Sequence, residues 1–392
     1  MFLWSRHPNG ETMRLVALCA SPRFVRFLLP IWDFMHQAGH ETHIVCGRDE
    51  EGVLADGVGP HQLHVVDIQR PITPWKDVVC LAQLQRLLRT VRPDVLHAHG
   101  PKAGLLGMVS ARMTGVAAPI YSIHGLRHET LHGARLHVVK NMEAMSCRLA
   151  RRVLCVSPSV QLRAQEDLGV AAHKIQVLGN GSAAGVDASL HYEPAVQRAA
   201  GTALRQSLGI ADVDPVVGYV GRLARDKGLL DLAAAWHLIK SRSPRAQLIL
   251  AGGVDLTDPV PLDELLGQAG VHVLGHVKDP APVYAALDVL VLPTYREGLP
   301  QVLLEAAAMQ VPVVATRVTG CTDAVLDGTT GTLVPARAPQ TLGQAVLTLL
   351  DDPARRETMG AFARERALRE FGIAPIASAT LRLYQELTEQ PR

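Results

Sequence analysis

The sequence has no CxxC pair, no long apolar run and few aromatic residues, and each of these absences removes a class of protein. Its six cysteines stand apart, mostly inside apolar stretches, which indicates reduced core thiols rather than a zinc site or a disulfide framework. No stretch approaches the roughly eighteen consecutive apolar residues that a membrane span needs, so no transmembrane helix is predicted. Aromatic residues make up 4% of the chain, unlike nucleic-acid binders that stack bases on aromatic rings.

Charge of neither sign dominates the chain. The formal net charge is +2, so no overall field favours DNA or RNA, and we expect no nucleic-acid partner. The opening residues MFLWSRHPNGE contain an apolar patch too short for a secretory signal, so secretion is not expected. We interpret residues 1–12, which precede the first strand-like run, as an extension from an early start codon or a disordered tip.

A length of 392 residues is too great for one ordinary core and suits two α/β domains with a cleft between them. Short β-branched runs alternate with longer segments rich in Leu, Ala and Arg, which is typical of βα units on parallel sheets. The predicted strands lie near residues 14–19, 42–46, 62–66, 94–98, 119–123, 153–156, 175–178, 216–220, 247–251, 271–274, 289–292, 312–315 and 331–334.

A polar, Ala-rich interval near residues 179–213 separates the two sets of strands and marks the expected junction. We expect an N-terminal Rossmann-like domain of residues 13–185 and a C-terminal Rossmann-like domain of residues 186–372. The segment 373–392 has apolar residues at helical spacing and is predicted to be a helix that crosses back to the N-terminal domain.

Ligands of open parallel sheets bind beyond the carboxyl ends of the strands, so the residues just after each strand are the candidates for chemistry. In this chain they are Ser21, Arg23, Gly47, Arg48, His99, Gly100, His124, Gly125, Gly221, Arg222, Gly252, Gly253 and Thr294 through Glu297.

The stretch EGLPQVLLE joins Glu297 to Glu305 through a Gly-Leu-Pro turn and an apolar helix start. Pro300 suits the first turn of a helix, and the amides at such an end attract anions. A carboxylate on each side of an anion site suits a ligand with both phosphate and hydroxyl groups, such as a nucleotide sugar. The alternative is a capped helix with Glu297 in its entry loop and Glu305 on a solvated face.

The segment GRLARDKG follows a predicted strand and opens a helix, so its tight turn can aim Arg222 and Lys227 at one phosphate group. Two cations would hold a diphosphate and stabilise the charge that grows as it departs. The alternative is two solvated cations at a loop.

These motifs, followed by LAGG, LGHV and REGLPQVLLEAAAMQVPVVATRVTGCTDAVLDGTTGTLV, resemble the C-terminal domain of family-4 glycosyltransferases, which are retaining enzymes of the two-Rossmann-domain GT-B fold. In the N-terminal half HAHGPKAGLLG, SIHGLRHET, RLARRVLCVSPS and LGNGSAAGVD are similar to the branch that builds bacterial surface glycans, exopolysaccharide and O-antigen on polyprenyl-diphosphate carriers. The resemblance covers nearly the whole chain. It implies that the domain of residues 13–185 binds the acceptor and that the domain of residues 186–372 binds the nucleotide sugar.

The resemblance implies a role for each matching residue. Arg222 and Lys227 match the pair on the donor diphosphate, Glu305 the carboxylate on the ribose hydroxyls, and Glu297 a contact to the donor sugar. The backbone contacts implied for the donor lie at Gly298, Leu299 and Pro300, over sugar and phosphate, and at Val277, beside the base. His124 matches a histidine that faces the donor sugar, so the implied catalytic residues are His124, Glu297, Arg222 and Lys227.

The acceptor side is less defined. After the first strand the chain has Ala20-Ser-Pro-Arg23 where many family members have a Gly-Gly turn, so Arg23 is a candidate contact to an acceptor phosphate, with Lys102 and Arg127. The basic segment 124–152, with interleaved apolar residues, is interpreted either as a surface that rests on an anionic membrane or as a mobile loop and an ordinary amphipathic helix.

No metal or other cofactor is expected. Asp212 and Asp214 have a DxD spacing but precede a strand, and we interpret them as a turn. His97 and His99 lie on one side of a strand, yet no third ligand is nearby in sequence.

The sequence therefore predicts a retaining, metal-independent glycosyltransferase that moves a sugar from a nucleotide-sugar, with UDP favoured, to a polyprenyl-diphosphate-linked bacterial surface glycan. We expect it in the cytoplasm, with possible peripheral contact to the plasma membrane. The alternatives are a nucleotide-sugar epimerase of the same fold and a non-catalytic nucleotide-sugar-binding subunit. A dehydrogenase is disfavoured because no GxGxxG follows the first strand.

Overall fold

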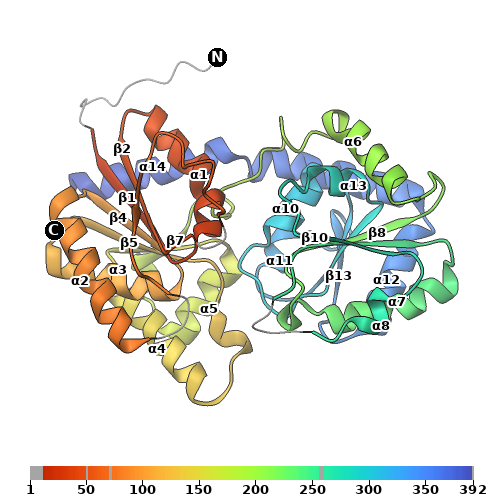
Figure 1. Cartoon of the computed structure of the whole chain (residues 1–392), viewed down its shortest axis with the longest axis horizontal. Helices are drawn as coiled ribbons and strands as arrows, with labels where there is room; N and C mark the ends of the chain where they lie inside the picture. The colour runs from red at the N-terminus through yellow and green to blue at the C-terminus, as the bar shows by residue number, and fades with distance from the viewer. Residues whose placement is uncertain (1–11, 50–51, 70–72, 256–259, 391–392) are drawn as a thin grey trace. The chain divides into compact units, whose positions relative to one another are not determined.

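The computed structural model describes residues 12–49, 52–69, 73–255 and 260–390, which divide into two compact units (Figure 1). The first unit runs to Ala184 and includes the chain again from Ile373, and the second spans Gly185–Gly372. The interpretation of residues 1–12 falls, apart from Thr12, outside the described part of the chain.

Each unit is built on one parallel sheet. The first sheet has the order β3-β2-β1-β4-β5-β6-β7, and the second has the order β10-β9-β8-β11-β12-β13. The strands of the first unit are β1 (Arg14–Cys19), β2 (Glu41–Cys46), β3 (Gln62–Val65), β4 (Val95–His99), β5 (Ala118–Ile123), β6 (Arg152–Cys155) and β7 (Ile175–Val177). In the second they are β8 (Val216–Val220), β9 (Gln247–Ala251), β10 (Val271–Gly275), β11 (Val289–Leu292), β12 (Val313–Thr316) and β13 (Gly331–Val334). All thirteen predicted strands are confirmed, each within one residue of its predicted bounds.

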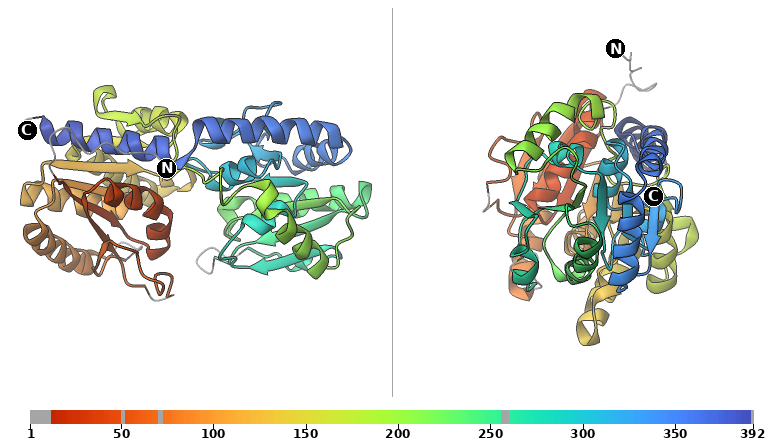
Figure 2. Two further views of the ribbon diagram at one scale, coloured as in Figure 1. Left: turned by 90° about the horizontal axis from the view of Figure 1, so that it is seen from above. Right: turned by 90° about the vertical axis from the view of Figure 1, so that its right-hand side faces the viewer.

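Helices cover both faces of each sheet, as the view from above in Figure 2 shows. The first unit contains α1 (Pro22–Gln37), α2 (Pro74–Val91), α3 (Pro101–Thr114), the 3-10 turn η1 (Arg127–Thr130), α4 (Gly133–Leu149), α5 (Pro158–Leu168), η2 (Ala172–Lys174) and α14 (Ile373–Glu389). The second contains α6 (Pro194–Ser207), η3 (Arg225–Lys227), α7 (Leu229–Arg242), α8 (Asp263–Leu266), α9 (Ala281–Ala285), α10 (Gln301–Ala308), α11 (Cys321–Ala324), α12 (Pro339–Leu350) and α13 (Pro353–Glu370). Several helices begin at a proline, whose missing N–H costs nothing at that position.

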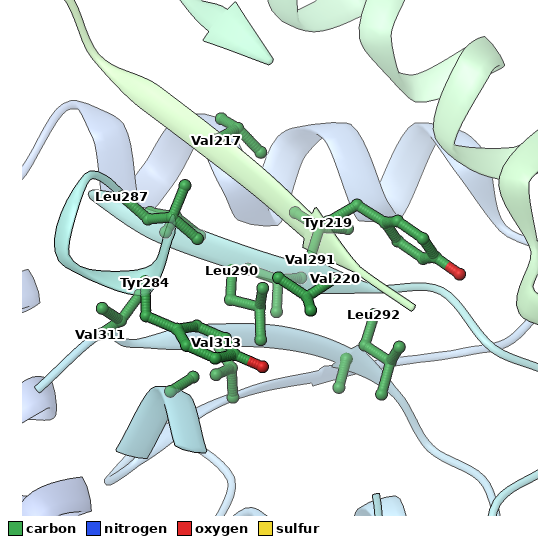
Figure 3. Packing of buried hydrophobic residues seen from close by; sticks show 14 of the residues in the cluster. Val217, Tyr219, Val220, Tyr284, Leu287, Leu290, Val291, Leu292, Val311 and Val313 are labelled. Carbon is green, nitrogen blue, oxygen red and sulfur yellow. The ribbon is translucent and has the colours of Figure 1, made fainter. Parts of the chain in front are cut away.

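The central strands are apolar along their whole length because helices bury both of their faces. Every residue of β8 (VVGYV) and of β11 (VLVL) is buried. Figure 3 shows part of this core, with Val217 and Tyr219 of β8 near Leu290 of β11. All six cysteines are buried and unpaired, which confirms that they are core thiols.

Helix α14 belongs to the first unit and packs against α1. Its apolar residues Ile376, Leu383 and Leu387 are buried, as their helical spacing predicts. The hydroxyl of Tyr384 lies 2.7 Å from Nδ1 of His97 on β4, which ties this helix to the sheet. Within the described ranges, no helix is both long and apolar enough to cross a membrane.

Candidate active site

The candidate donor site lies at the switch point of the second sheet. Strands β8 and β11 are neighbours there, and their chain connections lead away in opposite directions along the sheet, which opens a crevice at their carboxyl ends. Arg222 follows β8 by two residues, and Glu297 lies in the loop between β11 and α10. The structure thus places both predicted charged motifs at the edge where such sheets bind ligands.

Glycine is required where the loops of this edge meet. Gly228 has φ +70, and a Cβ at that residue would lie 1.8 Å from the carbonyl oxygen of Pro293. A Cβ at Gly252 would lie 1.7 Å from the carbonyl oxygen of Gly221, so the loops after β8 and β9 also touch. Because only glycine allows these approaches, the turn after β8 packs directly against the strand end of β11.

Lys227 and Glu297 form an ion pair across this contact. Lys227 Nζ lies 2.5 Å from Glu297 Oε1, and the two side chains are 17% and 13% exposed. The pair joins the GRLARDKG and EGLPQVLLE motifs, which the sequence analysis identified separately. It holds both charged groups at the carboxyl ends of β8 and β11.

Arg222 is also paired with carboxylates. Its guanidinium contacts the carboxylate of Asp255 and lies 3.4 Å from that of Asp226, which Arg296 contacts at 3.3 Å. The Arg222 side chain is 49% exposed, and exposed ion pairs stabilise a protein by only about 0–1 kcal/mol. The carboxylates of Asp255 and Asp226 are 17% and 19% exposed, so the guanidinium is the accessible member of each pair and the group that an incoming anion can reach.

Glu305 lies on α10 within a cluster of hydroxyl groups. The hydroxyl of Tyr284 on α9 donates to Glu305 Oε2 at 2.7 Å, and Tyr192 and Gln301 also hydrogen-bond to this carboxyl group. Burial raises the pKa of Glu305 to about 7, although these hydrogen bonds oppose the shift. The carboxyl group therefore changes charge close to neutral pH.

The turn Gly298-Leu299-Pro300 leads into α10, which begins at Gln301. Pro300 is the cap residue, so the prediction that it occupies the first turn is wrong by one position. A Cβ at Gly320 would lie 2.2 Å from the carbonyl oxygen of Gly298, which shows how closely the loop after β12 packs on this turn. The remaining predicted donor contact, Val277, follows β10 and packs against the apolar core, two strands away from β8.

His124 lies in the first unit, directly after β5. Its Nε2 is 2.9 Å from Nδ1 of His99, and the ring of Phe24 packs edge-on against it, with centroids 4.7 Å apart. Burial lowers the pKa of His124 to about 3. The imidazole is therefore neutral at physiological pH and acts as a hydrogen-bonding group, not as a cation.

The three predicted acceptor contacts lie on three different elements of the first unit. Arg23 is exposed near the start of α1, and Arg127 is exposed on η1. Lys102 is buried near the start of α3, with Nζ 2.5 Å from Asp77 Oδ1 on α2. The ammonium group of Lys102 therefore forms an ion pair with a carboxylate of the neighbouring helix α2.

The structure shows the surroundings of the two sequence patterns that we considered as metal sites and rejected. Asp212 and Asp214 lie in the turn before β8, as predicted. His97 lies between the hydroxyls of Tyr384 and Ser122, at 2.7 and 2.6 Å.

Several site residues had no sequence signal. Asp255 and Arg296 are ordinary charged residues in loops, and they meet Arg222 and Asp226 only because the strand ends converge. Tyr192 and Tyr284 are 92 positions apart, with ring centroids 6.0 Å apart beside Glu305. Asp226 could have been found, since it lies inside the GRLARDKG motif.

Two family models match the chain in succession. Residues 27–182 match Glycosyltransferase Family 4, and residues 214–352 match Glycosyl transferases group 1. Together they span most of both units.

Full-length relatives agree with these matches. The chain is 29% identical over 366 residues to the capsular polysaccharide biosynthesis glycosyltransferase CapM of Staphylococcus aureus, with 93% of each chain covered. It is 25% identical over 370 residues to the UDP-Gal:alpha-D-GlcNAc-diphosphoundecaprenol alpha-1,3-galactosyltransferase of Escherichia coli, covering 92% of this chain and 93% of that protein.

Solved structures agree on the fold. Alr3699/HepE of Anabaena, crystallised with UDP and glucose, superposes with a TM-score of 0.78 at 22% identity, covering 95% of this chain and all of the other. The chain belongs to the family-4 glycosyltransferases and has their two-domain GT-B fold, and it is related to transferases of capsular and polyprenyl-linked glycans.

Proposed function

We propose that this glycosyltransferase moves a sugar from a UDP-sugar to a polyprenyl-diphosphate-linked bacterial surface glycan, with retention of configuration and without a metal ion. The observation that carries the proposal is the convergence of Arg222, Lys227 and Glu297 at the carboxyl ends of β8 and β11, with Glu305 on the helix that follows. The E. coli relative is named for a UDP-sugar donor and a diphosphoundecaprenol-linked acceptor, which supports both substrate classes.

In this proposal the two cations, Arg222 and Lys227, stabilise the leaving group. In the free protein Glu297 pairs with Lys227, and Asp255 with Asp226 pairs with Arg222. A bound diphosphate takes the place of these carboxylates and receives both positive charges. As the bond from the anomeric carbon to the diphosphate oxygen breaks, Arg222 and Lys227 stabilise the charge on the leaving group, in the role that other enzymes give to a metal.

The remaining groups position the substrates. The Glu305 carboxylate accepts hydrogen bonds from the ribose hydroxyls, and Glu297, once separated from Lys227, contacts the donor sugar. The backbone at Gly298, Leu299 and Pro300 lies over the sugar and phosphate, Val277 holds the base, and neutral His124 contacts the sugar. The acceptor oxygen bonds to the same face of the anomeric carbon that the diphosphate leaves, and the acceptor proton departs with the diphosphate.

Acceptor binding and membrane contact are proposed for the first unit. Arg23 and Arg127 are exposed cations that can contact the acceptor diphosphate. Lys102 is buried against Asp77 and can contribute to acceptor binding only if it leaves that carboxylate. On α4, Arg135 and Arg148 are exposed together with apolar Val138 and Met145, which are 46% and 43% exposed. A helix face of this kind suits peripheral contact with an anionic leaflet.

A panel assay tests the proposal. The purified protein is incubated with UDP- and GDP-sugars, with and without polyprenyl-diphosphate sugars, and the products are read by mass spectrometry. The proposal expects transfer that needs both a UDP-sugar and the lipid acceptor. Turnover of the UDP-sugar alone would indicate an epimerase, and UDP binding without any transfer would indicate a non-catalytic subunit.

Variants test the assigned roles in the same assay. Lys227→Ala should lower kcat about 100-fold or more, because one charge on the leaving group is lost. Arg245→Ala is the matched control, since Arg245 is a 71% exposed cation of the second unit that is 4.0 Å from its nearest carboxylate. Near wild-type transfer by Lys227→Ala would contradict the assignment.

A further inference from the structure

His99 is a buried histidine whose role the proposed function leaves open. It is the last residue of β4, it is 6% exposed, and its Nδ1 lies 2.9 Å from Nε2 of His124. Its other ring nitrogen, Nε2, is buried and has no hydrogen-bond partner among the described residues. The two ring nitrogens of His99 therefore face very different surroundings.

This asymmetry decides which nitrogen carries the proton. The His99–His124 hydrogen bond needs one donor and one acceptor, so either His99 donates from Nδ1 or His124 donates from Nε2. If His124 donated, neutral His99 would carry its own proton on Nε2, as a buried N–H without an acceptor. Among backbone groups of folded proteins, a buried N–H without an acceptor is rarer than an under-satisfied carbonyl, and we apply the same preference to the imidazole ring. The arrangement therefore favours a proton on Nδ1 of His99 and a bare Nε2 on His124.

The surroundings keep both rings neutral. Aromatic rings flank His99, with centroid distances of 5.7 Å to Phe24 and 6.5 Å to Trp32, and the ring of His97 lies 4.1 Å away. Burial lowers the pKa of His99 well below its ordinary value, and neighbouring His97 and His124 add to the shift. A neutral His124 whose Nε2 accepts a hydrogen bond must carry its proton on Nδ1, and among the described residues no group bonds to that Nδ1 atom.

We propose that His99 is a positioning residue that holds His124 in its Nδ1-protonated tautomer, so that His124 presents a single uncharged N–H donor to an acceptor oxygen such as a sugar hydroxyl. The assignment of a sugar hydroxyl as the acceptor rests on the proposed function, whereas the tautomer of His124 does not depend on it. In this arrangement His99 is not a catalytic residue, because it acts only through His124.

Nitrogen-15 NMR of histidine-labelled protein tests the tautomer without any substrate. His124, assigned by comparison with His124→Gln, should show a protonated Nδ1 and a bare Nε2 at pH 7.5. The His99→Phe variant keeps an apolar ring in place and should convert His124 to a mixture of tautomers. His97→Gln is the matched control, since His97 lies on the same strand and is also buried, but it bonds to Tyr384 and Ser122 and not to His124. This variant removes the ring that lies against His99 but keeps the His99–His124 hydrogen bond, so His124 should stay protonated on Nδ1.

The outcomes separate the two proposals. An Nε2-protonated His124 in the wild-type protein would overturn the inference, as would an unchanged His124 in folded His99→Phe. If His99→Phe does not fold, the wild-type spectrum still tests the tautomer of His124, and His99→Leu replaces His99→Phe as the test of the role of His99. If the wild-type protein transfers no sugar but shows the Nδ1-protonated tautomer, the inference about His99 is supported and the proposed function fails.

Kinetics then test the positioning role. The His99→Phe variant should lower kcat/KM for the donor about 10- to 100-fold, the range that is usual when the hydrogen-bond partner of a metal-binding histidine is removed. His99→Asn should recover most of this loss, because its amide nitrogen can take the place of Nδ1 as the donor to His124. Equal activity of the His99→Phe and His99→Asn variants would contradict the positioning role.

Discussion

At the scale of single residues, Glu305 is a carboxyl group whose charge depends on pH near neutrality. Burial raises its pKa to about 7, while Tyr284, Tyr192 and Gln301 hydrogen-bond to it. The ionised form is the one that accepts hydrogen bonds at both oxygens, so only this form suits two ribose hydroxyls. Protonation below pH 7 should therefore weaken donor binding.

We predict that kcat/KM for the donor falls about tenfold from pH 8 to pH 6, with a midpoint near 7. The Glu305→Gln variant should have low activity and should lack this step, because its amide does not titrate. The measurement is the pH profile of both proteins at subsaturating donor. A step of the same size and position in Glu305→Gln would assign the titration to another group.

Contacts between individual side chains are the part of the structure that the sequence predicts least well. The motifs identify Arg222, Lys227, Glu297 and Glu305, but they do not show that Glu297 pairs with Lys227 in the free protein. Tyr192 and His99 gain their roles only from neighbours that are distant in sequence. Such contacts depend on how strand ends converge in space, which spacing within a motif does not contain.

At the scale of elements, the turn after β8 depends on one close approach. Gly228 and Gly209 have nearly the same backbone conformation, with φ +70 and +69. A Cβ at Gly228 would meet the carbonyl oxygen of Pro293 at 1.8 Å, whereas one at Gly209 would have no described heavy atom within 4 Å. The comparison separates the cost of the contact from the cost of a positive φ.

We predict that Gly209→Ala lowers the free energy of unfolding by about 1–2 kcal/mol, the usual cost of a left-handed conformation for alanine. Gly228→Ala should cost more and should also lower transfer activity, because η3 must move away from β11 and carry Lys227 with it. Urea unfolding and the transfer assay measure both effects. Equal losses in the two variants would show that the contact with Pro293 is not required.

A second element-scale feature joins η1 to the helices that follow it. His128 on η1 is buried, with Nδ1 3.1 Å from Glu143 Oε2 of α4 and Nε2 3.0 Å from Asp167 Oδ2 of α5. The hydrogen bond to Glu143 raises the pKa of His128, and the bond to Asp167 adds to the shift, although burial opposes it. The two carboxylates on either side of His128 therefore favour its protonated form.

His128→Leu should remove the imidazole that hydrogen-bonds to the fully buried carboxylate of Glu143, whereas Asp167 keeps its ion pair with Arg163. Because a buried charge loses its opposite charge, the variant should destabilise the protein by about 3 kcal/mol or more. Because the folded-state pKa is raised, the stabilisation is complete below pH 6.5 and is lost as pH rises through the folded-state value. Urea unfolding between pH 6 and pH 9 should show this loss in the wild-type protein and not in His128→Leu. A wild-type stability that rises over this range in parallel with the variant would contradict this role of His128.

At the scale of the whole molecule, the sequence predicts the architecture closely. All thirteen strands follow from short β-branched runs, since strands buried on both faces must be apolar along their length. The error at Pro300 is one residue, because a proline can precede a helix as well as begin it. The sheet order, which places β8 beside β11, determines where the site lies, and the sequence alone does not state it.

A crystal structure with bound UDP tests the central claim most directly. The account predicts the diphosphate within hydrogen-bond distance of Arg222 and Lys227, with Glu297 released from Lys227 and the ribose hydroxyls on Glu305. A nucleotide bound away from the carboxyl ends of β8 and β11, or one that leaves the Lys227–Glu297 pair intact, would contradict it.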